Sequence, residues 1–317
     1  MLTGGTIGSV ADENNVRGLD NRNNSILMSK FSSDDEVLIS SPFTILSEMM
    51  DGEHITRLVS ETEKVLRSGV EGIIITHGTD TIQYSAAALA YAFADTDVPI
   101  VLVSSNMPLD FEGSNGLDNL EAAIAFIRSG LGDGVFAAYR NGNESTKIHR
   151  ATRLLANHEY DEYFNSLDGK YYASYENGQC VKNPCYEELT NDLMIGPFTI
   201  KDSSNTTLII RPYVGFGMEI DLDEVEDIII HPYHSGTINT ANEKLKKILE
   251  NAKSSGIRVW MIGSSPDVVY ESMVGLKGVR ILPRMTEISA YMKLWILKSK
   301  GMEVDLILSP SAGDIMP

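Results

Sequence analysis

Cysteine is scarce in this chain, which has only Cys180 and Cys185 among its 317 residues. Two cysteines are too few for a disulfide framework, although their C-x4-C spacing leaves a single bridge open. Reduced thiols in a reducing compartment are the favoured interpretation of so low a count. We therefore expect a cytoplasmic protein.

Long apolar runs are missing as well. None approaches the roughly 18 residues of a membrane-spanning helix, and no basic-then-apolar leader opens the sequence. Positive charge is also in deficit, with 26 Lys and Arg against 44 Asp and Glu and a net charge of −18. A polyanion is repelled by such an average field, so we expect neither nucleic acid nor a membrane surface as a partner.

What is present is the composition of a globular protein, with 43 % hydrophobic and 22 % charged residues. Short apolar runs alternate with segments of helical periodicity, and we predict strands over 71–76, 99–104, 134–140, 227–231, 258–263 and 279–283. The helices are predicted over 80–95, 116–129, 238–255 and 285–300. Continuous apolar strands separated by helices are typical of a parallel sheet covered on both faces. The predicted fold class is α/β.

The alternation is interrupted over 186–206, where charge, Gly, Pro and Ser mix without periodicity. We place the domain boundary there. The expected organisation is a larger N-terminal catalytic α/β domain (1–190) with a mostly parallel sheet, a linker (191–206) and a smaller C-terminal α/β domain (207–317). Either part is long enough to form a core of its own.

Polar residues at strand ends are the candidates for chemistry, because ligands of open parallel sheets bind beyond the carboxyl ends of the strands. The first candidate is Thr3-Gly4-Gly5-Thr6-Ile7-Gly8, where the glycines let backbone N–H groups approach a ligand closely. It matches neither of the two common glycine-rich nucleotide motifs. Taken alone, it is better explained by an ordinary tight turn.

The second candidate, His77-Gly78-Thr79-Asp80-Thr81, directly follows a predicted strand. Thr79 or Asp80 as a plain helix N-cap is the simplest explanation. The crowding of one carboxylate and two hydroxyl groups at one strand end argues against this explanation.

The third candidate is Lys147, which follows the strand at 134–140. Most such lysines are solvated, but one that is partly buried beside Asp80 and Thr79 would be able to lose a proton and act as a base.

Taken together, TGGTIG, HGTDT about 70 residues later and a lysine about 70 residues further resemble the L-asparaginase and glutaminase family, and the bacterial type I L-asparaginases in particular. The resemblance extends along essentially the whole chain. Further segments that are similar to family patterns are Ser47-Glu48-Met49-Met50, Ser104-Ser105-Asn106-Met107-Pro108-Leu109, Met285-Thr286-Glu287 with Lys293-Leu294, and the ending Ala312-Gly313-Asp314.

The resemblance implies hydrolysis of the side-chain amide of L-asparagine through a threonine nucleophile and an acyl-enzyme. It implies Thr6 as the primary nucleophile, and Thr79 as the second threonine with Lys147 and Asp80 as its relay. Asp80 is also expected to hold the substrate α-ammonium.

The remaining implied contacts concern substrate binding and assembly. Ser47 and Glu48 are expected to face the substrate α-carboxylate, and Ser105 to belong to the substrate-binding set. Neither metal nor cofactor is implied, and a homodimer or homotetramer is expected. His231-x2-His234 is interpreted as structural or substrate-gating. The loop that carries His234 and Asn239 corresponds to one that lies near the site in the family, but it differs from the commoner G-x-G-N form.

Two features depart from the family pattern. The family places a tyrosine on a loop about 10 to 13 residues after the nucleophile, and this window holds Val16 and Leu19 instead. Loss of a general base typically costs about 10²–10⁴-fold in rate. Only Met1 and Leu2 precede the glycine-rich turn where the family has a strand, so we expect further residues upstream.

Three functions therefore remain open. An amidohydrolase acting on asparagine, with glutamine as a possible second substrate, is favoured. An asparaginase-like protein that binds amino acids with weak turnover or none is motivated by the missing tyrosine. The amidase subunit of a tRNA-dependent amidotransferase shares the motifs, but it is disfavoured by the short N-terminus and by the negative charge.

Overall fold

The structure, a computed structural model, describes residues 1–11, 17–19, 22–157, 160, 162–188, 191–264, 270–274 and 276–316. Its helices are α1 (Arg22–Met28), α2 (Gly52–Leu66), α3 (Ile82–Ala92), α4 (Gly116–Ser129), α5 (Glu243–Ser254) and α6 (Glu287–Lys300). Its strands are β1 (Ser9–Ala11), β2 (Arg17–Leu19), β3 (Ile73–Thr76), β4 (Pro99–Val103), β5 (Gly134–Arg140), β6 (Thr146–Arg150), β7 (Ala173–Glu176), β8 (Gln179–Lys182), β9 (Thr207–Ile210), β10 (Asp227–Ile230), β11 (Arg258–Met261) and β12 (Val279–Ile281).

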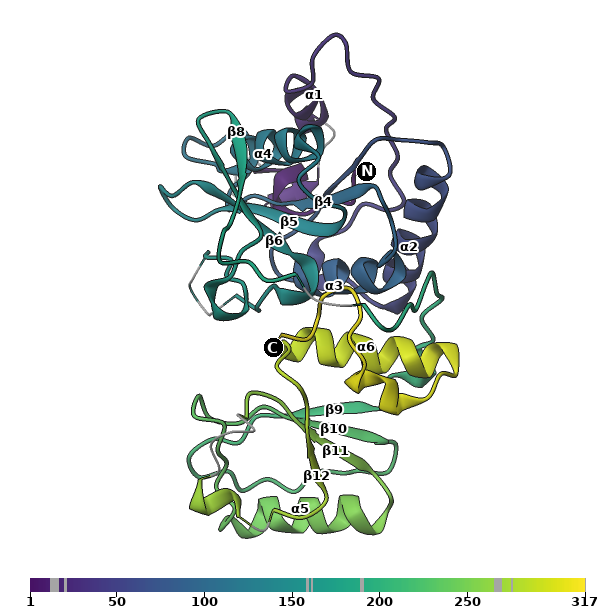
Figure 1. Ribbon diagram of the computed structural model, residues 1–317, viewed down its shortest axis with the longest axis vertical. Coiled ribbons are helices and arrows are strands. Elements are labelled where there is room, and N and C mark those ends of the chain that lie inside the picture. The colour runs from purple at the N-terminus through teal and green to yellow at the C-terminus, as the bar shows by residue number, and fades with distance from the viewer. Residues whose placement is uncertain are drawn as a thin grey trace.

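A six-stranded sheet in the order β3-β4-β5-β6-β7-β8 forms the upper part of the molecule (Figure 1). Strands β3, β4 and β5 are parallel, and β5 to β8 pair antiparallel. The α/β class is confirmed, but the larger sheet is mixed rather than mostly parallel. The reason is that short turns, residues 141–145 and 177–178, join β5 to β6 and β7 to β8, and such short connections require antiparallel strands.

The second sheet has four parallel strands in the order β12-β11-β10-β9. All ten predicted strands and helices are present with their predicted type. Their ends shift by a few residues, most of all in α5, which begins at Glu243 where Asn242 caps it through its side chain. The segment 191–206 lies between the two sheets in sequence, and the exact domain division stays a prediction.

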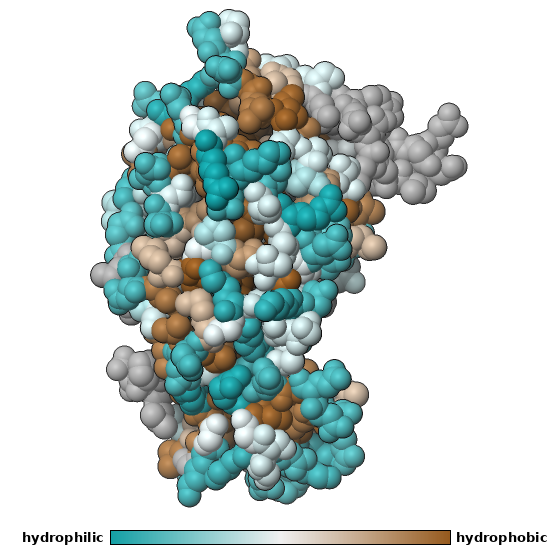
Figure 2. Space-filling view, turned by 90° about the vertical axis from the view of Figure 1, so that its right-hand side faces the viewer, coloured by the Kyte–Doolittle hydropathy of each residue, from teal (hydrophilic) through white to brown (hydrophobic). Residues whose placement is uncertain are grey.

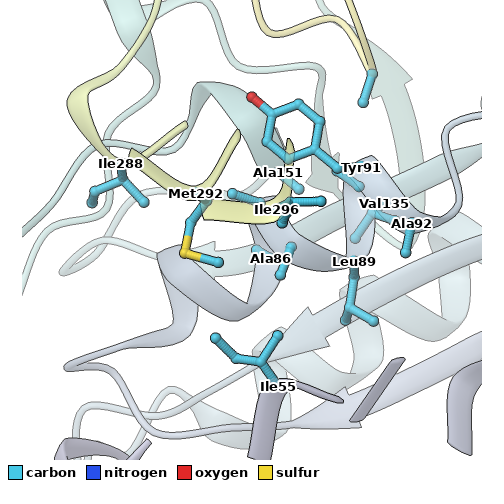
Figure 3. Close-up of a cluster of buried hydrophobic side chains, with 14 of the residues drawn as sticks. Ile55, Ala86, Leu89, Tyr91, Ala92, Val135, Ala151, Ile288, Met292 and Ile296 are labelled. Atoms are coloured by element: carbon cyan, nitrogen blue, oxygen red, sulfur yellow. The ribbon is translucent and has the colours of Figure 1, made fainter. Parts of the chain in front are cut away.

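Helices α3 and α6 pack against each other between the two sheets, as Figure 1 shows. Alanines along α3 allow a close approach, because Ala86, Ala88 and Ala90 are almost fully buried. Figure 3 shows Ala86 of α3 beside Met292 and Ile296 of α6. Helix α4 covers the opposite face of the large sheet with Leu120 and Phe126, and α5 covers the far face of the small sheet (Figure 1).

Residues 1–4 lie alongside the large sheet. Leu2 bridges to Thr76 in parallel, Leu2 N–H donates to Ser40 O at 2.8 Å, and Gly4 bridges to Ile45. This extended segment therefore places the glycine-rich turn at the carboxyl end of β3.

Of the helices that the structure describes, none combines the length and the apolar character that crossing a membrane requires. Figure 2 shows polar side chains scattered among apolar ones over one face of the molecule.

A buried ion pair fastens the C-terminal segment to α6. Lys293 Nζ donates to Asp314 Oδ2 at 2.7 Å and to Ser309 O at 2.6 Å, and both charged side chains have no exposed surface. Tyr91 of α3 donates to the same carboxylate at 3.0 Å. The similarity of Ala312-Gly313-Asp314 to a family ending therefore has a structural basis in this contact.

Replacing Lys293 by Met leaves the Asp314 carboxylate buried without its cation. We expect the free energy of unfolding to fall by about 3–5 kcal/mol, as in other broken buried pairs. Urea unfolding followed by circular dichroism measures this loss. The matched control is Lys246→Met, which removes an exposed pair with Glu243 and should change stability by less than about 0.5 kcal/mol. Equal effects of the two variants would contradict the role given to Lys293.

Candidate active site

The glycine-rich turn begins the site. Gly5 has φ of +75°, a left-handed conformation that favours glycine. A Cβ on Gly5 would also collide with the backbone of Gly78. Ile7 has no exposed surface and anchors the turn in the core. Thr6, directly after Gly5, opens a short 3-10 helix (Thr6–Gly8) and stays partly exposed.

Ser47 lies on the next segment, in a 3-10 turn over Ser47–Met49. A Cβ on Gly78 would lie 2.5 Å from the Cβ of Ser47, so glycine is required for this approach. Ser47 Oγ donates to Asp80 Oδ2 at 3.3 Å, and Thr81 Oγ1 donates to Ser47 O at 2.8 Å. The glycine-rich turn, the Ser47 turn and residues 77–81 therefore close on one another at the carboxyl end of β3.

Helix α3 begins without using its polar residues as caps. The helix starts at Ile82, its N-cap position is Thr81, and no side chain caps it. Thr79 and Asp80 are thus not N-caps, which removes the simplest structural explanation for them. Thr79 is half-buried and Asp80 is exposed. A helix N-terminus beside them offers unpaired N–H groups and a field that favours negative charge.

The buried side chain of His77 links residues 77–78 to the first turns of α3. It is 1 % exposed, its Nδ1 lies 2.9 Å from Gly78 O, and its Nε2 lies 2.9 Å from Ser85 Oγ. Burial lowers the pKa of His77 from 6.5 to about 4, against a smaller opposing effect of the Gly78 carbonyl. The neutral ring therefore donates from Nδ1 to the carbonyl and accepts from the Ser85 hydroxyl. This role of His77 was not predicted from the sequence.

Ser105 follows β4 at the same edge of the sheet. His77 N–H donates to Val103 O at 2.8 Å, which joins the two strand ends. Ser105 has no exposed surface, and among the described residues its Oγ has no hydrogen-bond partner. Its Cβ packs against Gly116 at the start of α4. A buried hydroxyl without a partner at this edge is compatible with the predicted substrate-binding set, which stays a prediction.

Lys147 lies on β6 opposite Tyr139 of β5. Residues directly opposite in an antiparallel pair share a face, and Tyr139 packs in the core cluster that contains α3. Lys147 therefore lies on the α3 side of the sheet, near its carboxyl edge. Its ammonium forms an ion pair with Glu144 and lies 5.3 Å from the centre of the Tyr171 ring. Within the described part of the chain, no hydrogen bond links it to Thr79 or Asp80, so the relay stays a prediction.

Of the other predicted positions, one adjoins the Ser47 turn, and the rest lie elsewhere or outside the described residues. Glu48 is exposed beside Ser47. Val16 lies outside the described residues, and of Leu19 only the backbone in β2 is described. His234 and Asn239 are exposed in a loop of the second sheet, and His231 lies 2.6 Å from Glu287. Cys180 and Cys185 are both free thiols.

Comparison with known proteins assigns the chain to a family. The family model described as asparaginase, N-terminal, matches residues 1–183, more than half of the chain. The chain belongs to the asparaginase family. The matched region contains the three segments that close on one another, as well as Ser105 and Lys147. The sequence resemblance to the family is thereby confirmed.

The curated relatives of this asparaginase-family chain are named as amidotransferase subunits rather than as asparaginases. A glutamyl-tRNA(Gln) amidotransferase subunit of Methanosphaera stadtmanae is 29 % identical over 182 residues, which cover 56 % of this chain and 41 % of that protein. The subunit of the same name from Pyrococcus abyssi is 26 % identical over 87 % of this chain and 66 % of its own length. The chain thus spans less than two thirds of these relatives.

Solved structures extend the likeness of the fold to the whole chain. The thermostable L-asparaginase from Thermococcus kodakarensis matches with a TM-score of 0.78 and 20 % identity, covering 100 % of this chain and 98 % of that one. L-asparaginase I from Vibrio cholerae matches with a TM-score of 0.75 and 19 % identity, covering 100 % and 98 %. At these identities the likeness establishes the fold, including the second sheet that the family model leaves out.

The buried imidazole of His77 makes this asparaginase-family site sensitive to acid. Its pKa of about 4 in the folded chain lies below the 6.5 of an unfolded histidine. The unfolded state therefore binds more protons between these values, and stability falls as the pH drops from about 6.5 to 4, by roughly 3 kcal/mol for this residue.

Urea unfolding at a series of pH values measures this effect. The stability of His77→Gln should depend less steeply on pH in that window than the stability of the parent. His234→Gln, at an exposed histidine, should keep the parental slope. A parental slope in His77→Gln would show that the ring at position 77 does not titrate on unfolding.

Proposed function

We propose that the protein hydrolyses the side-chain amide of L-asparagine to L-aspartate and ammonia. The observation that carries the proposal is the closure of Gly5, Ser47 and residues 77–81 on one point at the carboxyl edge of the large sheet. This closure gathers a serine hydroxyl, a carboxylate and two threonines at neighbouring positions. Such a set suits an α-amino acid that carries an amide.

The contact between Ser47 and Asp80 matches the backbone end of an amino acid. A hydroxyl donor and a carboxylate lie 3.3 Å apart there, and an α-carboxylate and an α-ammonium lie on adjacent bonds of the substrate. Ser47 would donate to the substrate carboxylate while Asp80 receives its ammonium. Glu48, which the resemblance placed against the α-carboxylate, is exposed beside them, and its negative charge favours the ammonium instead. The substrate side chain would then extend toward Thr6 and Thr79.

The chemistry follows from that orientation. A threonine hydroxyl attacks the amide carbon, and backbone N–H groups at the glycine-rich turn and at the start of α3 stabilise the oxyanion, each typically by a few kcal/mol. Ammonia leaves when the nitrogen takes up the proton that the threonine hydroxyl gives up on attack, and the acyl-enzyme forms. Water then attacks the ester, releases aspartate and restores the hydroxyl. We assign the primary attack to Thr6, and the relay to Thr79, Asp80 and Lys147.

A second candidate is release of ammonia from glutamine, because the chain resembles subunits named glutamyl-tRNA(Gln) amidotransferase, a name that concerns amide transfer. The two amides differ by one methylene, which is worth only about 1–3 kcal/mol in a pocket. Both substrates therefore belong in the same assay.

We expect the protein to act in the cytoplasm, since one structure of similar fold is described as a probable cytoplasmic L-asparaginase from Campylobacter jejuni. We also expect it to form a homodimer or homotetramer.

The test is ammonia release from asparagine and from glutamine at equal concentrations. Thr6→Val and Thr79→Val should reduce turnover to background, and Lys147→Met should lower kcat by about 10²–10⁴-fold. The control is Thr96→Val, at a threonine in the loop between α3 and β4 on the opposite edge of the sheet, which should retain full activity.

Calorimetry distinguishes an enzyme from a binding protein. Heat that accumulates slowly after injection of asparagine indicates hydrolysis, and prompt binding heat alone indicates a protein that binds amino acids without turnover. Folded parent protein that releases no ammonia from either amide would refute the proposal.

A further inference from the structure

Lys147 is held by two groups that no motif of the sequence marks. Glu144 lies three residues before it in the β5–β6 turn and forms an ion pair with its ammonium. Tyr171, which precedes β7, places its ring 5.3 Å from the same nitrogen. A carboxylate and an aromatic face are both favourable partners of an ammonium, and the ring attracts the cation through its quadrupole.

The turn that carries Glu144 is fixed by the structure around it. Glu144 N–H donates to Asn141 O at 2.9 Å. Asn141 is 3 % exposed and exchanges hydrogen bonds with the backbone of Phe164 at 2.9 and 2.8 Å. The carboxylate of Glu144 is therefore attached to a backbone that has little freedom to move.

The backbone of Tyr171, on the other flank of Lys147, is also held by hydrogen bonds. Its N–H donates to Gly169 O at 3.1 Å, and its carbonyl accepts from Asn183 Nδ2 at 2.8 Å. Ser174, three residues further, pairs with Lys147 in the sheet. The lysine side chain thus leaves β6 between two rigid segments, one on each flank.

We infer that Glu144 and Tyr171 are positioning residues for Lys147 in the proposed amide hydrolysis. A lysine side chain has four rotatable bonds, and a quarter of this one is exposed to solvent. Without its two partners the ammonium would sample many positions. With them it stays on the α3 side of the sheet, near the carboxyl edge. The inference rests on that function for its catalytic meaning, and on the contacts alone for its geometry.

The kinetic test uses four variants. Glu144→Gln and Tyr171→Leu should each lower kcat about tenfold with KM within twofold, because a displaced group costs rate more than binding. Tyr171→Phe keeps the ring and should retain at least half of the parental kcat. The matched control is Glu243→Gln, which breaks another Glu–Lys pair at the same i,i+3 spacing, 2.8 Å long, in α5, and should leave kcat unchanged. Parental kcat in both Glu144→Gln and Tyr171→Leu would overturn the inference.

A second measurement needs no turnover. Acylation of lysines by acetic anhydride, followed by mass spectrometry of the peptide that contains Lys147, reports how firmly the ammonium is held. Glu144→Gln and Tyr171→Leu should raise the rate of labelling at Lys147 several-fold, while Tyr171→Phe and Glu243→Gln should not. An unchanged rate in the first two variants would overturn the inference even in an active enzyme. A raised rate in a protein that hydrolyses neither amide would uphold the positioning and refute the proposed function.

Discussion

The structure depends on the contact of two glycines, Gly5 and Gly78, across the end of β3. Neither position has room for a Cβ, because one faces the backbone of the other and the second faces Ser47. Any side chain there would separate the glycine-rich turn from residues 77–81. The same contact determines which groups meet: the serine at 47 joins the carboxylate at 80, and two threonines flank the junction.

Several contacts with the rest of the fold hold the segments of that junction in place. Ile7 anchors the first segment in the core, and the neutral ring of His77 fixes the second through Gly78 O and Ser85. Helix α3, which begins at the junction, is pressed against α6 (Figure 3), and the buried pair of Lys293 and Asp314 holds α6 to the end of the chain. Helix α6 and the C-terminal segment thus contribute to the order of a site that lies on the first sheet.

Much of this arrangement was predictable from the sequence. Continuous apolar strands and amphipathic helices gave the α/β class, and HGTDT after a strand located the second segment of the site. The antiparallel strands β6 to β8 were not predicted, because they are short and mostly polar: in β6, Thr146–Arg150, Ile148 is the one apolar residue. The role of His77 and the two partners of Lys147 were missed for another reason. His77 lies within HGTDT, but its burial and its contact with Ser85 follow only from packing. Glu144 is marked by no motif, and Tyr171 is distant from Lys147 in sequence.

The most direct test of the proposed site is a crystal structure of the protein with L-aspartate bound. We predict the α-carboxylate within hydrogen-bond distance of Ser47 Oγ, the α-ammonium at Asp80, and the side-chain carboxylate between the hydroxyls of Thr6 and Thr79. Aspartate bound at any other place, with this junction occupied only by water, would contradict the proposal.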